Sequence, residues 1–171
     1  RRRAPKRAAV GGGGAAAKPS SSGLEALLRA TALLSRASTP DEVIRGALDT
    51  VRSTLGWDFA ALWSLDPTTG SALLLGACGN EAALPFGQRP LQVWTGRGAQ
   101  GRAWQHMQPV AFDTSVDPAS CERDAHVYAA GFKSGVTVYV DTRAARYFVE
   151  FFAEAGRSGA EHELAVCEAA A

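Results

Sequence analysis

The sequence lacks the marks of several common classes of protein. Its 171 residues include three cysteines, Cys78, Cys121 and Cys167, and no CxxC pair, which argues against a disulfide scaffold or a thiolate zinc site and favours a reducing compartment. No apolar run reaches the roughly 18 to 20 residues of a membrane-spanning helix. Hydrolase motifs and phosphate-binding loops are also missing. With 46% hydrophobic and 20% charged residues, we expect one soluble, intracellular and cytoplasmic globular protein.

Acidic residues are missing from the first 22 positions, which hold six arginines and lysines. This stretch has four consecutive glycines and one large apolar residue, so we expect a disordered basic tail or linker over 1–22 and one folded domain over 23–171. The tail is open to three interpretations: a linker, an organellar targeting segment or a nucleic-acid-binding arm. Residues 23–171 carry the other 12 basic residues and all 17 acidic residues, and this net charge of −5 argues against a nucleic-acid partner.

Two helices are expected at the start of the folded part. Apolar residues recur at helical spacing over 24–37, which predicts an amphipathic helix. The next helix has a clear start at Thr39, because Pro40 suits a first turn and Glu42 completes a capping box. It is expected to end at Gly56.

From Trp57 onward the apolar period changes from 3.6 to 2, which predicts strands. We expect six of them, over 57–65, 71–78, 91–94, 108–112, 136–140 and 145–153, with hairpins joining the first pair and the last pair. Short helices are expected over 98–107 and 119–130, and a last one over 159–171. The order predicts an α+β domain: a six-stranded antiparallel sheet with terminal helices on one face and an irregular cover on the other.

Gly96-x-Gly98-x-x-Gly101 has the letters of a dinucleotide-binding fingerprint. However, two helices and two strands precede it, whereas the fingerprint belongs to the first strand of a doubly wound domain. We therefore interpret these glycines as a tight turn that directs a short helix.

Candidate ligand-binding residues lie in the expected cover and on the last strand. A space between a sheet and its cover, lined by aromatic side chains and a few polar groups, is a common ligand site, although the same aromatics could simply fill a core. Glu150 lies between apolar neighbours in the last strand, so it either forms the polar floor of a pocket or faces solvent. Cys121 and His126 are spaced for one helix face and could act together, although a plain packed thiol is the simpler interpretation. The candidates are Trp94, Trp104, Cys121, His126, Phe132 and Glu150.

Several stretches together resemble GAF domains. The sequence GAQGRAW over 98–104, followed by Gln108-Pro109-Val110, is similar to their central G-x-x-G-x-A-W…P-V signature. The stretch over 121–136, the FVEFF of 148–152 and the GWDF…WSLD of 56–66 are similar to the later and the first elements of that fold. The order and spacing are closest to GAF sensors associated with chemotaxis-type signalling proteins.

The resemblance implies a non-enzymatic regulatory domain that senses a small molecule and can form a homodimer through its terminal helices. The alternatives are a degenerate GAF fold that serves only for dimerisation or docking, and a thiol enzyme like the free methionine sulfoxide reductases. The residues typical of cyclic-nucleotide-binding members are missing, and Glu122 stands where bilin-binding members commonly have a histidine after their cysteine. The sequence carries no strong signal for haem, bilin, a cyclic nucleotide or a metal, and it does not name the ligand.

Overall fold

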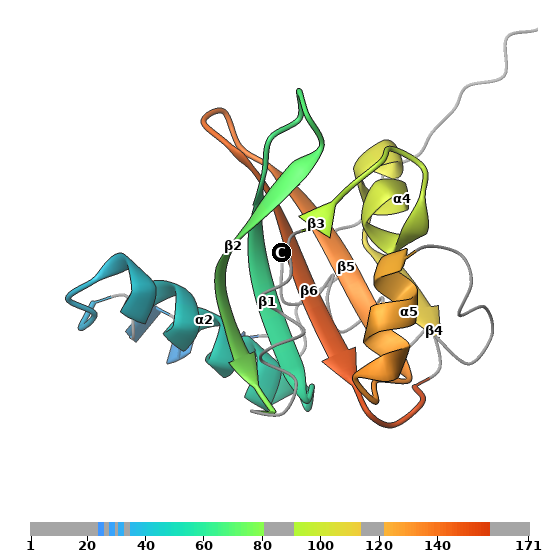
Figure 1. Ribbon diagram of the computed structural model, residues 1–171. Helices are drawn as coiled ribbons and strands as arrows, with labels where there is room; N and C mark the ends of the chain where they lie inside the picture. The colour runs from blue at the N-terminus through green and yellow to red at the C-terminus, as the bar shows by residue number, and fades with distance from the viewer. Residues whose placement is uncertain are drawn as a thin grey trace, which may run out of the picture.

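The computed structural model describes residues 24–25, 28–29, 31–32, 35–80, 91–113 and 122–157. A single sheet forms the centre of the molecule, and helices pack around it (Figure 1). The residues described between positions 24 and 32 are helical. The elements that follow are α2 (Pro40–Leu55), β1 (Phe59–Leu65), β2 (Ser71–Gly79), β3 (Leu91–Gln92), α4 (Gly98–His106), β4 (Val110–Asp113), α5 (Glu122–Ala129), β5 (Ser134–Asp141) and β6 (Arg146–Ala153).

The sheet has six strands in the order β3-β2-β1-β6-β5-β4, and every neighbouring pair is antiparallel. The predicted β1–β2 and β5–β6 hairpins are confirmed. The centre of the sheet joins β1 to β6, two strands far apart in the sequence, with Phe59 opposite Phe152 and Leu65 opposite Arg146. The predicted fold class is thus confirmed, and the antiparallel pairing is incompatible with a doubly wound dinucleotide fold.

Helix α2 has the predicted boundaries, and its cap has the predicted geometry. The Thr39 hydroxyl accepts a hydrogen bond from the Glu42 amide at 3.2 Å, while the Glu42 carboxylate accepts one from the Thr39 amide at 3.3 Å. These reciprocal bonds satisfy amide groups that a helix start otherwise leaves unpaired.

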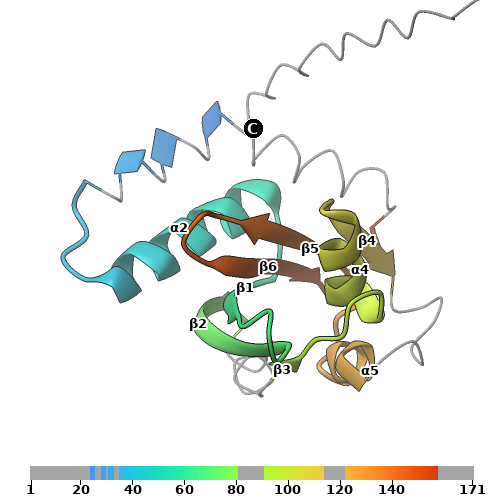
Figure 2. The same cartoon turned by 90° about the horizontal axis from the view of Figure 1, so that it is seen from above.

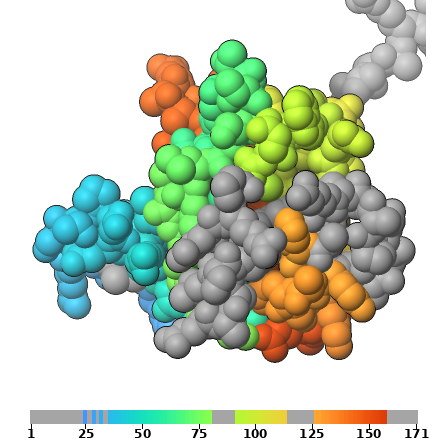
Figure 3. Space-filling view, viewed as in Figure 1, coloured from blue at the N-terminus to red at the C-terminus, as the bar shows by residue number. Residues whose placement is uncertain are grey.

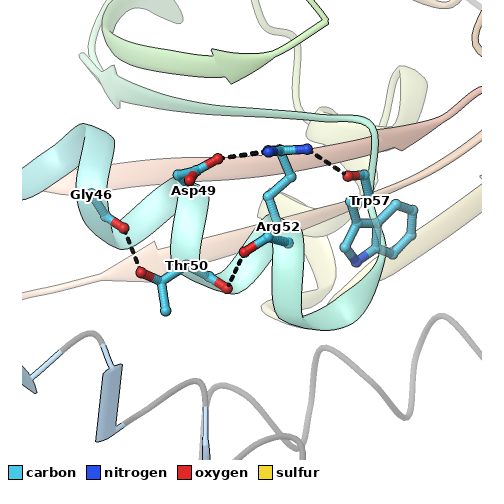
Figure 4. Close-up of polar contacts among 6 residues, drawn as sticks. Gly46, Asp49, Thr50, Arg52 and Trp57 are labelled. Atoms are coloured by element: carbon cyan, nitrogen blue, oxygen red, sulfur yellow. Dashed lines mark hydrogen bonds and ion pairs between the residues drawn. The ribbon is translucent and has the colours of Figure 1, made fainter.

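One face of the sheet is covered by α2 (Figure 2). The apolar side of this helix packs through Leu48 and its neighbours onto Ala60, Val136 and Phe151. Polar contacts secure the last turns: the Thr50 hydroxyl donates to the Gly46 carbonyl at 2.7 Å, and Arg52 binds both Asp49 and the Trp57 carbonyl (Figure 4). The start of β1 is thereby held against the end of α2.

The opposite face is covered by α4 and α5 (Figure 2). Aromatic rings fill much of this side: Phe132 stacks on Phe152 with centroids 5.4 Å apart, Phe59 contacts both of these rings, and Phe112 contacts Phe152. This is the larger of the two apolar clusters. The functional candidates on β6 and α4 face this side.

Three sequence-based expectations differ from the structure or lie beyond the described residues. The third strand, expected over 91–94, is limited to Leu91–Gln92, because only Ser71 and Ala72 of β2 pair with it before the chain turns toward α4. The tail over 1–22 and the helix expected over 159–171 lie outside the described residues.

Candidate functional site

The polar centre of the α4 side of the sheet is Glu150. Its side chain is fully buried on the central strand β6, between Ala61 of β1 and Thr137 of β5. The Trp63 indole donates a hydrogen bond to Oε2 at 2.7 Å, and the Gln100 amide donates one to Oε1. Burying a carboxylate is costly unless donors compensate it, and here a strand and the cover helix each supply one. Of the two sequence-based interpretations of Glu150, the exposed sheet face is therefore wrong.

The position of Gln100 follows from the glycines around it. The chain turns through Gly96 and Gly98, which have φ angles of 80° and 64°, a region that residues with a Cβ rarely adopt. At Gly101 the helix lies so close to the Trp94 carbonyl that an added Cβ would collide with it. The Gly96 amide donates to the Gly101 carbonyl at 2.8 Å. The interpretation of these glycines as a tight turn that directs a short helix is confirmed.

This turn brings the first residues of α4 down onto the sheet. Gly98, Ala99 and Gln100 are all buried, and Gln100 is the third residue of the helix. The Glu150 carboxylate therefore lies beside the first turn of α4, where the helix dipole favours negative charge. We call Glu150, Gln100 and Trp63 the Glu150 unit.

The Thr137 side chain adds a second polar group next to this unit. Thr137 is fully buried and lies directly opposite Glu150 in the β5–β6 register. Directly opposite residues point to the same face of a sheet. In the described part of the structure its hydroxyl has no hydrogen-bond partner. A buried hydroxyl beside a buried carboxylate is thus available to a further polar group.

Aromatic side chains surround the Glu150 unit. Trp104 and Phe132 pack in the α4-side cluster, as expected for a covered site, and Phe132 is 1% exposed. Phe148 also points to this side and packs on Tyr139. The bulk of Phe148 on this side of the sheet favours a core that is filled by side chains rather than open to a ligand.

The structure does not bring all six candidates together. Glu150, Phe132 and Trp104 share the α4 side, and His126 is half-buried on α5. Trp94 lies on the surface with 59% of its side chain exposed, because the chain leaves the sheet after Gln92. Cys121 lies outside the described residues.

Sequence reasoning missed Gln100 and Trp63 as members of the site. Trp63 is 87 residues from Glu150 in the chain, so only the β1–β6 pairing brings them together. A signal for Gln100 did exist: it is the one polar side chain within the run of small residues at 98–101.

The cysteine that the structure describes faces the other side of the sheet. Cys78 is half-buried in the α2-side cluster, and burial, together with the negative charge of Asp49, raises the pKa of its thiol to about 11. A thiol with such a pKa is almost entirely protonated at neutral pH and is a poor nucleophile. Cys167, like Cys121, lies outside the described residues, so the distances between the cysteines are untested.

The described ranges also lack two further kinds of feature. They contain no group of three or more histidine, cysteine, aspartate or glutamate side chains arranged to hold a metal ion. Within the same ranges, none of the helices has the length and apolar character needed to cross a bilayer.

No protein-family model matches the sequence, and no curated protein sequence matches it either. Solved structures do share its fold. The GAF domain of A. aeolicus NLH2 is 11% identical, with a TM-score of 0.64 over 87% of this chain and 90% of its own. The phycoerythrobilin-bound GAF domain of a cyanobacterial phytochrome is 18% identical, with a TM-score of 0.61 over 86% of this chain and 94% of its own.

A third similar structure is an enzyme, the free methionine-R-sulfoxide reductase of Neisseria meningitidis in complex with its substrate. It is 15% identical, with a TM-score of 0.59 over 86% of each chain. At such identities the likeness concerns the fold and not the activity. The six-stranded antiparallel sheet and its two covered faces agree with these structures, and the chain has the fold of GAF domains.

Proposed function

We propose that this chain is a non-enzymatic regulatory domain that senses a small molecule on the α4 side of its sheet. The Glu150 unit is the observation that carries this proposal. It places a buried carboxylate, an amide and an indole N–H, with the Thr137 hydroxyl beside them, between a central strand and the cover helix. The domain would act within a longer, cytoplasmic signalling protein of the chemotaxis type.

The mechanism follows from what the Glu150 unit connects. Gln100 belongs to α4, Trp63 to β1 and Glu150 to β6, so the carboxylate holds the cover helix to the two central strands. A ligand whose polar group replaces the Gln100 amide at Glu150 favours a different position of α4. The ligand then shifts the balance between two arrangements by its difference in affinity for them, and attached segments respond.

The fold of the similar structures supports a small-molecule ligand. One of them is a bilin-bound GAF domain and another is an enzyme in complex with its substrate. The raised pKa of Cys78 and its place on the α2 side favour regulation over thiol chemistry at that residue.

A second candidate function is dimerisation or docking by a GAF fold with a filled core. The mutually packed rings of Phe59, Phe132 and Phe152 favour it, because they occupy the side on which a ligand would bind. Leu24 and Leu28, one helical turn apart, are 49% and 62% exposed and could pair with a second copy. Size-exclusion chromatography with light scattering tests this candidate: Leu24→Glu/Leu28→Glu should convert a dimer into a monomer.

A thermal-shift screen of small metabolites against the full chain tests the sensing proposal. A ligand present at about 100 times its Kd stabilises a protein by about 2.7 kcal/mol, which gives a clear rise in Tm. The rise should be lost in Glu150→Gln and kept in Glu154→Gln, the same substitution at an exposed glutamate. Ligands that stabilise both variants equally would contradict a role for Glu150. In a separate assay, reduction of free methionine sulfoxide by the chain in the presence of a thiol reductant would favour a thiol enzyme over a regulatory domain.

A further inference from the structure

The outer surface of α4 and of the turn before it carries two arginines, Arg97 and Arg102, whose charge no described residue pairs with. Residues 91–112 contain Arg97, Arg102 and His106 and no aspartate or glutamate. This segment lies at the surface of the molecule, in yellow-green in Figure 3. It is distinct from the buried Glu150 unit, which uses the inner side of the same helix.

Contacts within the segment hold the turn before α4 against the helix, so the surface side chains of the two border one another. The turn before α4 packs along the helix, because the Gln105 amide oxygen lies next to Gly96 and the Trp94 carbonyl lies next to Gly101. Arg102 and His106 are one helical turn apart and therefore share a face. We call this patch the α4 outer surface; it consists of Trp94, Arg97, Arg102, Gln105 and His106.

The α4 outer surface has the composition of a binding surface. The Trp94 side chain is 59% exposed, and Arg97 is exposed beside it. Within the described ranges, the guanidinium groups of Arg97 and Arg102 make no ion pair or hydrogen bond. By contrast, Arg29, Arg52 and Arg146 each pair with a carboxylate. Tryptophan and arginine are the residue types that most often dominate the energy of protein interfaces.

We propose that the α4 outer surface docks an acidic segment of a partner protein that also carries an apolar side chain. Carboxylates of the segment pair with Arg97 and Arg102, and its apolar side chain packs on the Trp94 ring. The nine residues of α4 span about 13 Å, which matches about two and a half turns of a partner helix. A nucleic-acid strand is less well matched, since the patch offers one aromatic ring, whereas single strands are bound by several stacked in succession.

Fluorescence anisotropy of the full chain with labelled synthetic probes tests the proposal. The first probe is a peptide of about 14 residues with paired glutamates and leucines at helical spacing. The others are the same peptide with alanine for leucine, the same peptide with lysine for glutamate, and an oligothymidylate. The variants are Arg97→Ala/Arg102→Ala and Trp94→Ala. One matched control removes two exposed arginines elsewhere that pair with no described residue (Arg36→Ala/Arg143→Ala). The other removes an aromatic residue on α5 of similar exposure (Tyr128→Ala, 57% exposed).

The glutamate–leucine peptide should bind saturably, and more tightly than the other three probes. Each α4 variant should weaken its binding by about tenfold, and each control by less than about twofold. Absence of saturable binding of this peptide, or equal losses in the variants and their controls, overturns the proposal. Tighter binding of the oligothymidylate with the same dependence on Trp94 also overturns it, in favour of a nucleic-acid surface. Circular dichroism of each variant verifies the fold, which substitutions at exposed side chains should preserve.

Discussion

Replacement of Glu150 by alanine is the most informative perturbation of this fold. It removes the acceptor for the Trp63 indole, which is fully buried, and for the Gln100 amide, which is 3% exposed. A buried donor left without a partner costs about 1–3 kcal/mol, and here there are two. The vacated volume adds to the loss, while release from burying a carboxylate offsets part of it. We expect the free energy of unfolding to fall by about 3–5 kcal/mol, a large share of the roughly 5–15 kcal/mol typical of a domain.

Glu150→Gln provides the comparison, because it keeps the size and removes the charge. The new amide oxygen can accept from the Trp63 indole, and the new amide NH₂ can donate to the Gln100 carbonyl oxygen once that side chain rotates by half a turn. We therefore expect a loss of only about 1 kcal/mol, the difference between charged and neutral hydrogen bonds. Urea unfolding followed by circular dichroism gives both values, provided that the m-value is unchanged.

Two results would refute this reasoning. A loss below about 1 kcal/mol for the alanine variant would mean that the two donors find other partners or water. Equal losses for the alanine and glutamine variants would mean that charge, not hydrogen bonding, holds α4 to the sheet. Glu154→Ala, at an exposed position, should change stability by less than about 0.5 kcal/mol.

Three smaller predictions concern other parts of the molecule. Thr39→Ala removes the N-cap acceptor of α2 and should cost about 1 kcal/mol in the same urea assay; an unchanged value would contradict the capping box. Gly101→Ala forces a Cβ into the carbonyl of the preceding turn and should cost about 1–3 kcal/mol, whereas Gly156→Ala, where a Cβ meets open space, should cost much less. In a Cys121→Ser/Cys167→Ser background, Cys78 should react with iodoacetamide at pH 8 about 100-fold more slowly in the folded than in the urea-unfolded chain. The reason is that a pKa of about 11 leaves little thiolate in the folded chain. Similar rates in the two states would refute the raised pKa.

The elements that local chemistry determines could be predicted from the sequence. The boundaries of α2 follow from the Thr39–Glu42 cap and from Gly56. In both cases the residues in contact are close neighbours in the sequence. The hairpins follow from strands joined by short turns, such as Asp66 to Gly70. The order of the sheet was not predictable in this way, because the β1–β6 pairing joins segments about 87 residues apart and no local signal determines it.

The site was predictable only in part, for the same reason. Glu150 is visible as an acid in an apolar strand, but its donors come from β1 and α4, which meet it only in the folded chain. Trp94 illustrates the opposite error: an aromatic residue at the end of an expected strand suggests burial, whereas the turn that Gly96 and Gly98 require carries it to the surface. Hydrophobicity predicts how often a residue type is buried, and not which individual side chain is exposed.

The claim that the Glu150 side of the sheet holds a small molecule is tested most directly by native mass spectrometry. The full chain, of 17.9 kDa, is incubated with a metabolite extract of cells, desalted, and measured before and after denaturation. We predict an additional mass that is lost on denaturation, is greatly reduced in Glu150→Gln and persists in Glu154→Gln. The bare protein mass in all three preparations, whether as a monomer or a dimer, would contradict the sensing proposal and favour the docking module with a filled core.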